Sequence, residues 1–136
     1  MGGETILIAD DEHNVREMIG TYLRDAGYRT VSAHYGAGAL AAVELRTPGL
    51  LLADVNTPVM NGLQLAIEVR ASGRTAGIPI MMLSALGQPR EVLSGYSAGA
   101  GEYVTRPVEL EVLLAKIESL LSRRPSGRAV ALRDER

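Results

Sequence analysis

Short apolar runs alternate along the chain with longer segments in which apolar residues recur at helical spacing. Three of these runs show no polar alternation, which is typical of parallel strands buried on both faces. They are residues Thr5–Ala9, Gly49–Ala53 and Ile78–Leu83. Weaker apolar patterns over Arg29–Ala33 and Glu102–Thr105 predict two further strands, nearer the edges of the sheet.

Helical periodicity fills the stretches between these strands. Apolar residues from Val15 to Ala26 follow one helix face, and Gly27 ends the segment. A stripe of leucine and isoleucine from Leu110 to Leu121 predicts the last helix. Helices are also expected over residues 36–46 and 62–72. A further helix, the fourth in chain order, is expected over 88–98, where glycines weaken the pattern.

Five strand–helix units therefore account for nearly the whole chain. Strands joined by helices run parallel with right-handed crossovers, so the pattern predicts an α/β, three-layer, doubly wound domain. The 136 residues suit one such domain. We expect it to cover residues 1–122, with residues 123–136 as a basic tail or linker that contains Pro125 and Gly127.

Composition and charge narrow the class of protein. Hydrophobic residues make up 46% and charged residues 22%, and there is no cysteine, which excludes disulfides and thiolate chemistry. No apolar run reaches membrane-spanning length, and the first residues do not form a secretory signal. The net charge of −2 divides into +3 over residues 123–136 and −5 over the remainder. We therefore expect a cytoplasmic protein with neither a nucleic-acid nor a membrane surface.

Polar residues stand where the predicted strands end. Asp10 and Asp11 follow the first strand, Asp54 the third, Ser84 the fourth and Arg106 the fifth. In an open parallel sheet the functional site lies beyond these carboxyl ends. If the first and third strands are neighbours, three carboxylates share one corner. Two of them about 5 Å apart repel by ~3 kcal/mol at an effective dielectric of 20, so the corner needs a cation or a proton.

An oxygen-lined corner of this kind suits Mg²⁺. The simpler alternative is that Asp10 and Asp11 only favour the start of the following helix, where negative charge is stabilised. Asp54 favours the metal site, because a carboxylate at the end of a buried strand is costly without a purpose.

Four segments together resemble the response-regulator receiver domain, the CheY-like module of two-component signalling. They are Ile6-Leu-Ile-Ala-Asp-Asp-Glu12, Leu51-Leu-Ala-Asp-Val-Asn-Thr-Pro-Val-Met-Asn-Gly62, Pro79-Ile-Met-Met-Leu-Ser-Ala85 and Gly99-Ala-Gly-Glu-Tyr-Val-Thr-Arg-Pro107. The resemblance covers residues 4 to about 122. It implies a flavodoxin-like (βα)5 fold with strand order 2-1-3-4-5.

The resemblance also assigns roles by position. It implies that Asp54 is the phospho-acceptor and that Asp10, Asp11, Asp54 and the backbone carbonyl of Asn56 hold Mg²⁺. Ser84 and Arg106 would bind the phosphoryl oxygens, and Ser84 and Tyr103 would be the switch residues. The peptide bond before Pro107 would be cis. The donor would be a histidine kinase or phosphotransfer protein. The domain would bind an output protein or a second copy of itself through its fourth helix, fifth strand and fifth helix. The domain would be a switch rather than an enzyme, with at most slow self-dephosphorylation.

Arg106 is the main departure, because the family has lysine there. The chain has one lysine, Lys116, which lies in the last helix. Arginine keeps the charge and can grip phosphate with two nitrogens, but it is longer and planar. One interpretation is that Arg106 still clamps the phosphoryl group. The other is a non-phosphorylated pseudo-receiver that acts as a docking module. Thr57, where methionine is usual, is a minor departure.

Other patterns in the sequence are weaker. The glycines at 36 and 38 imitate a dinucleotide fingerprint, but they stand in the second strand–helix unit rather than the first. A haloacid-dehalogenase-type phosphatase would need an acid where Asn56 stands. His13 and His34 are expected to be exposed histidines rather than functional ones. The alternative to a switch role for Tyr103 is a partly buried residue of an edge strand. Val112 lies away from the core stripe of the last helix, which suggests a partner surface.

Overall fold

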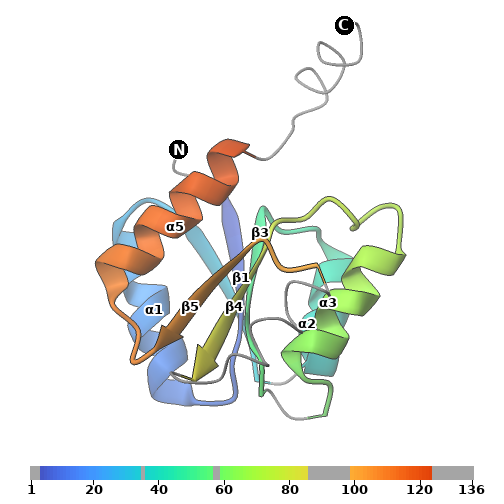
Figure 1. The fold of residues 1–136 in the computed structure, drawn as a ribbon, viewed down its shortest axis with the longest axis horizontal. Coiled ribbons are helices and arrows are strands. Elements are labelled where there is room, and N and C mark those ends of the chain that lie inside the picture. The colour runs from blue at the N-terminus through green and yellow to red at the C-terminus, as the bar shows by residue number, and fades with distance from the viewer. Residues whose placement is uncertain (1–3, 35, 57–58, 86–98, 124–136) are drawn as a thin grey trace, which may run out of the picture.

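The computed structural model describes residues 4–34, 36–56, 59–85 and 99–123. Within these ranges five parallel strands form one sheet in the order β2-β1-β3-β4-β5 (Figure 1). The strands are β1 (Thr5–Ala9), β2 (Arg29–Ala33), β3 (Leu50–Asp54), β4 (Ile80–Ala85) and β5 (Glu102–Arg106). The predicted strand order is confirmed, and the two weaker strands lie at the edges.

Four helices lie in the described ranges and cover both faces of the sheet. They are α1 (His13–Asp25), α2 (Gly36–Leu45), α3 (Gly62–Ala71) and α5 (Leu110–Arg123). Helices α1 and α5 lie on one face and α2 and α3 on the other, which gives the expected three layers (Figure 1). The helix predicted over 88–98 and most of the predicted tail lie outside the described residues, so the boundary at 122 stays a prediction.

Strand β1 shows why the central strands lack polar alternation. Ile6 and Ile8 pack in the core beneath α1 and α5, whereas Leu7 and Ala9 pack in the core beneath α2 and α3. All four side chains are at most 1% exposed. Because each face of the sheet is covered by helices, both sets of alternating residues must be apolar. None of the helices in the described ranges has the length and apolar character that crossing a bilayer requires.

Strand β4 begins two residues later than predicted. The Ile78 N–H donates to the Thr75 carbonyl, so Ile78 belongs to the turn that follows α3. The guanidinium of Arg70, in the last turn of α3, donates to the carbonyls of Ala76 and Ile78 and, through two nitrogens, to that of Gly99. One side chain therefore fastens α3 to the start of β4 and to the approach to β5.

Replacing Arg70 with methionine should lower the free energy of unfolding by about 2 kcal/mol, because charged hydrogen bonds to three carbonyls disappear together. Urea-induced unfolding followed by circular dichroism measures the loss. The matched control is Arg29→Met, an exposed position on edge strand β2, where a change within about 0.5 kcal/mol is expected. Equal midpoints for the two variants would contradict a fastening role for Arg70.

Candidate functional site

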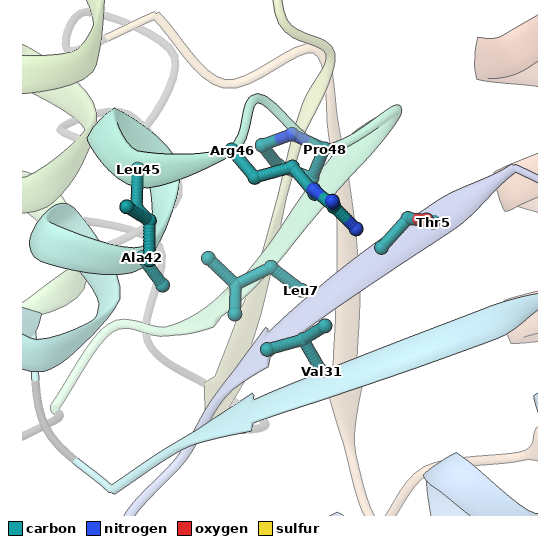
Figure 2. A pocket seen from close by; sticks show the side chains of 7 residues that line it. All are labelled: Thr5, Leu7, Val31, Ala42, Leu45, Arg46 and Pro48. Atoms are coloured by element: carbon teal, nitrogen blue, oxygen red, sulfur yellow. The ribbon is translucent and has the colours of Figure 1, made fainter.

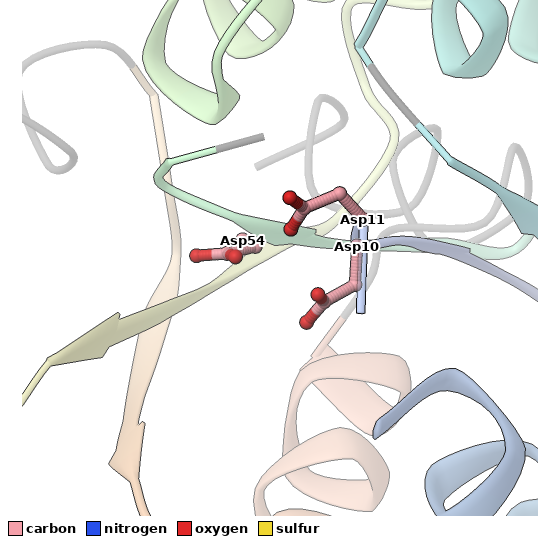
Figure 3. Close-up of side chains that lie close together, drawn as sticks. All are labelled: Asp10, Asp11 and Asp54. Carbon is pink, nitrogen blue, oxygen red and sulfur yellow. The ribbon is translucent and has the colours of Figure 1, made fainter. Parts of the chain in front are cut away.

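Three carboxylates meet at the carboxyl ends of β1 and β3. These strands are neighbours, with Ala9 paired to Ala53, so Asp10 and Asp11 leave β1 beside Asp54 at the end of β3. One oxygen from each of the three side chains lies within 4.8 Å of the others. Asp10 is 0% and Asp54 6% exposed, whereas Asp11 faces solvent. Figure 3 shows the three side chains gathered at this point, which we name the acidic corner.

Backbone groups hold the two buried acids in place. The N–H of Glu12 donates to Asp10 Oδ1 at 2.9 Å, and the N–H of Asn56 donates to Asp54 Oδ1 at 3.1 Å. The guanidinium of Arg16, buried on α1, donates to the Asp10 backbone carbonyl at 2.7 Å. These bonds fix both carboxylates before any ligand enters. Arg16 was missed by the sequence analysis, because one arginine in an amphipathic helix carries no distinctive signal.

Arg106 also lies at the acidic corner. Its Nη2 is 2.7 Å from Asp10 Oδ2 and 2.8 Å from Asp54 Oδ2, and its Nη1 lies 3.8 Å from Glu12 Oε1. It belongs to β5, which is separated from β3 by β4, so the long side chain reaches across a strand. The peptide bond between Arg106 and Pro107 is cis, as the resemblance implied.

Burial and the neighbouring opposite charges act in opposite directions on the pKa values of Asp54 and Arg106. Burial raises the pKa of Asp54 above its usual value, the Asn56 N–H and Arg106 oppose the rise, and the nearby Asp10 and Asp11 add to it. Burial tends to lower the pKa of Arg106, but its hydrogen bond to Asp10 and the charge of Asp54 outweigh that effect and raise it. Arg106 therefore stays charged and offsets one of the three acids.

The donor set fits a hard divalent cation. Three carboxylates and one guanidinium leave an excess of two negative charges (−3 + 1 = −2) at the acidic corner when all are ionised. Carboxylate oxygens with room for water are the ligands that Mg²⁺ prefers. Asp10, Asp11 and Asp54 are the side chains that could hold such an ion.

Ser84 and Tyr103 lie on the strands next to the acidic corner. Ser84 is 1% exposed and pairs with Thr105, one residue after the position where Leu83 pairs with Asp54. Tyr103 is 5% exposed and packs in the core on the α2 and α3 side of the sheet. Its backbone carbonyl accepts a hydrogen bond from Lys116 Nζ at 2.7 Å, which joins β5 to α5. The structure thus brings Asp10, Asp11, Asp54 and Arg106 together. It places Ser84 on the neighbouring strand and Tyr103 in the core.

The structure also describes the residues of the weaker sequence patterns. Both histidines are exposed, and Val112 is 42% exposed on α5. A Cβ at position 36 would overlap the Met60 carbonyl oxygen, so close packing accounts for Gly36 without a dinucleotide. A separate hollow of about 490 Å³ lies between β1, β2 and the end of α2 (Figure 2). Its lining includes Leu7, Leu45 and Arg46 but no carboxylate.

The fold and the acidic corner define a class: doubly wound α/β domains with a carboxylate cluster that could hold a cation at the carboxyl edge of the sheet. Comparison with known proteins identifies the family. Residues 6–118 match the family model of the response regulator receiver domain, and the chain belongs to this family. It is the receiver domain of a two-component response regulator, and such domains are generally switches rather than enzymes.

The relatives agree with this assignment. The chain is 38% identical over 127 residues to the phosphate regulon transcriptional regulatory protein PhoB of Pseudomonas aeruginosa, covering 93% of this chain and 56% of PhoB. It is 37% identical to the DNA-binding dual master transcriptional regulator RpaA of a Synechocystis species, covering 87% of this chain and 49% of RpaA. The chain thus spans about half the length of these curated relatives.

Solved structures show the same fold. A putative response regulator from Chloroflexus aurantiacus superposes with a TM-score of 0.87 at 36% identity, covering 89% of this chain and 99% of that one. The chemotaxis response regulator CheY4 of Vibrio cholerae gives 0.82 at 30% identity, covering 87% and 98%. Neither these relatives nor the acidic corner supports the alternative of a non-phosphorylated docking module.

Proposed function

We propose that Asp54 accepts a phosphoryl group from a phosphohistidine, on a histidine kinase or a phosphotransfer protein, and so switches a protein-binding surface. The observation that carries the proposal is the convergence of three carboxylates with Arg106 at one edge of the sheet. An Asp54 carboxylate oxygen attacks phosphorus, and the phosphorus–nitrogen bond of the donor breaks. The donor imidazole keeps the electron pair of that bond, and an acyl phosphate remains on Asp54.

Asp10, Asp11, Asp54 and the Asn56 backbone carbonyl would hold Mg²⁺, which supplies charge neutralisation between the acceptor and the phosphoryl oxygens. Phosphoryl transfer depends mainly on such positioning and charge stabilisation. The buried Asp54 is already oriented by the Asn56 N–H. Ser84 and Arg106 would hold the remaining phosphoryl oxygens, because a hydroxyl and a guanidinium both donate to anions.

The switch would run from the acidic corner into β5. In this structure Tyr103 lies inward and Ser84 is buried beside Asp54. A phosphoryl group that draws in Ser84 would bias the packing of Tyr103 between two states. An output protein or a second copy would bind through a face that includes β5 and α5, where Val112 is exposed. The predicted helix over 88–98, which the resemblance adds to this face, lies outside the described residues. Slow self-dephosphorylation and a cytoplasmic location fit this role.

The test is covalent phosphoryl uptake by the purified chain. Incubation with a small phosphodonor and Mg²⁺ should add about 80 Da, the mass of one phosphoryl group, as measured by intact-protein mass spectrometry. Chelation of the divalent cation should prevent the gain, because the acidic corner would then lack its neutralising ion. The lack of any gain, together with the lack of measurable Mg²⁺ binding, would refute the proposal.

A further inference from the structure

Arg16 is a buried cation that bonds to the backbone of the acidic corner rather than to a carboxylate. The residue is 6% exposed, and its Nη1 donates to the Asp10 carbonyl at 2.7 Å. Its Nη2 lies 3.4 Å from His13 Nδ1. None of the ion pairs among the described residues includes Arg16. Burial of a charge without an ion-pair partner is costly, so the bond to Asp10 needs an explanation beyond packing.

This bond holds the peptide unit that joins Asp10 to Asp11. A peptide unit is planar and rigid, so a guanidinium that holds the Asp10 carbonyl also fixes the direction in which the chain enters Asp11. The other polar groups of Asp10 are held separately, since its N–H donates to the Ala33 carbonyl and its Oδ1 accepts the Glu12 N–H. No described residue donates a hydrogen bond to the exposed Asp11 carboxylate. The orientation of Asp11 toward the other two acids therefore depends on the backbone that Arg16 holds.

The start of α1 lacks the side-chain cap that α3, the other helix beside the acidic corner, possesses. Glu12 is the N-cap of α1, and its side chain makes no capping bond. Helix α3 begins with a capping box formed by Asn61 and Gln64. The Arg16 N–H donates to the Glu12 carbonyl, and the Arg16 side chain returns to Asp10. Arg16 therefore ties the first turn of α1 to the end of β1, where no side-chain cap does so.

We propose that Arg16 is a positioning residue for the metal site: by holding the Asp10 carbonyl it directs Asp11 toward the Mg²⁺ position and so raises the Mg²⁺ affinity. The inference rests on the proposed metal site. Residues that orient metal ligands contribute about ten- to a hundredfold to metal affinity. The charge of Arg16 acts in the opposite direction, because a nearby cation repels the metal ion. The test must therefore separate orientation from charge.

A double-mutant cycle with Asp11 makes this separation. Calorimetric titration at one fixed ionic strength gives the Mg²⁺ dissociation constants of the unmodified chain, Arg16→Met, Asp11→Ala and the chain with both substitutions. The charge of Arg16 is lost in both backgrounds, so its effect cancels in the ratio of the two changes. Orientation of Asp11 acts only where Asp11 is present. Arg16→Met should therefore weaken Mg²⁺ binding about tenfold more in the presence of Asp11 than in its absence.

Arg70→Met controls for a general loosening of the fold. Arg70 is a half-buried arginine whose printed bonds also go to backbone carbonyls, those of Ala76, Ile78 and Gly99. These carbonyls precede β4 and β5, at the edge of the sheet opposite the acidic corner. The Mg²⁺ affinity of Arg70→Met should stay within twofold of the unmodified chain. A cycle ratio below twofold, or equal weakening by Arg70→Met and Arg16→Met, would overturn the inference.

A second measurement needs no substitution. In the unmodified chain, nuclear magnetic resonance should show the Arg16 side-chain N–H protons protected from exchange with water both before and after Mg²⁺ saturation, because the bond to Asp10 persists. Loss of this protection at saturation would also overturn the inference. Phosphoryl uptake by the unmodified chain in any of these cases would leave the proposed function standing. The absence of both Mg²⁺ binding and phosphoryl uptake in the unmodified chain would overturn the inference and the proposed function together.

Discussion

Asp54→Asn is expected to take up no phosphoryl group from a small phosphodonor, whereas the unmodified chain gains about 80 Da. The substitution keeps the size of the side chain and the oxygen that accepts the Asn56 N–H. It removes the negative charge and the nucleophilic oxygen from which an acyl phosphate forms. Loss of uptake therefore identifies the reacting atom rather than a change of shape.

The matched control is Asp25→Asn, which makes the same chemical change at the exposed end of α1. It should take up the phosphoryl group at the rate of the unmodified chain. Intact mass after a fixed incubation with donor and Mg²⁺ compares the three proteins. A full mass gain in Asp54→Asn would move the acceptor to another residue, and peptide mapping would then test Asp10 and Asp11 first.

Much of the fold could be predicted because it follows from local pattern. The apolar runs in β1, β3 and β4 lack polar alternation, and only a sheet covered on both faces explains three such strands joined by helices. The acids at the ends of β1 and β3 could be placed together because neighbouring parallel strands end at the same edge. The acidic corner therefore follows from strand order and the positions of three residues.

The contacts that complete the site could not be predicted in the same way. Arg106 pairs with Asp54 across β4 and with Asp10, at the end of β1, across β4 and β3, and sequence spacing does not specify the reach of a side chain. The bond from Arg16 to the Asp10 carbonyl and those from Arg70 to Gly99 are equally specific to the packed structure. Each joins a side chain to a backbone carbonyl, for which no residue type is required at the accepting position.

Gly62 also lies close to backbone atoms at the end of β3. Gly62→Ala is therefore expected to lower both the free energy of unfolding and the rate of phosphoryl uptake. A Cβ at position 62 would lie 2.6 Å from the Asp54 carbonyl oxygen and 3.0 Å from the Val55 Cα. Both atoms belong to the backbone at the end of β3, where the Val55 N–H bonds to the Leu83 carbonyl, so they cannot yield easily. Alanine is favoured over glycine within a helix by at most about 1 kcal/mol. Overpacking against rigid backbone costs about 3 kcal/mol, which exceeds the gain from helix propensity, so the substitution should lower the free energy of unfolding.

The same clash acts on the reaction, because the atom that must move is the carbonyl of the proposed phospho-acceptor. A displacement of about 1 Å can slow a positioned reaction by roughly a hundredfold, so phosphoryl uptake by Gly62→Ala should fall by that order even where the protein is folded. Gly73→Ala is the matched control, since a Cβ there meets nothing within 4 Å. Urea unfolding and the rate of mass gain are measured on both variants. If Gly62→Ala matches Gly73→Ala in both, the approach of α3 to Asp54 does not hold the acceptor in place.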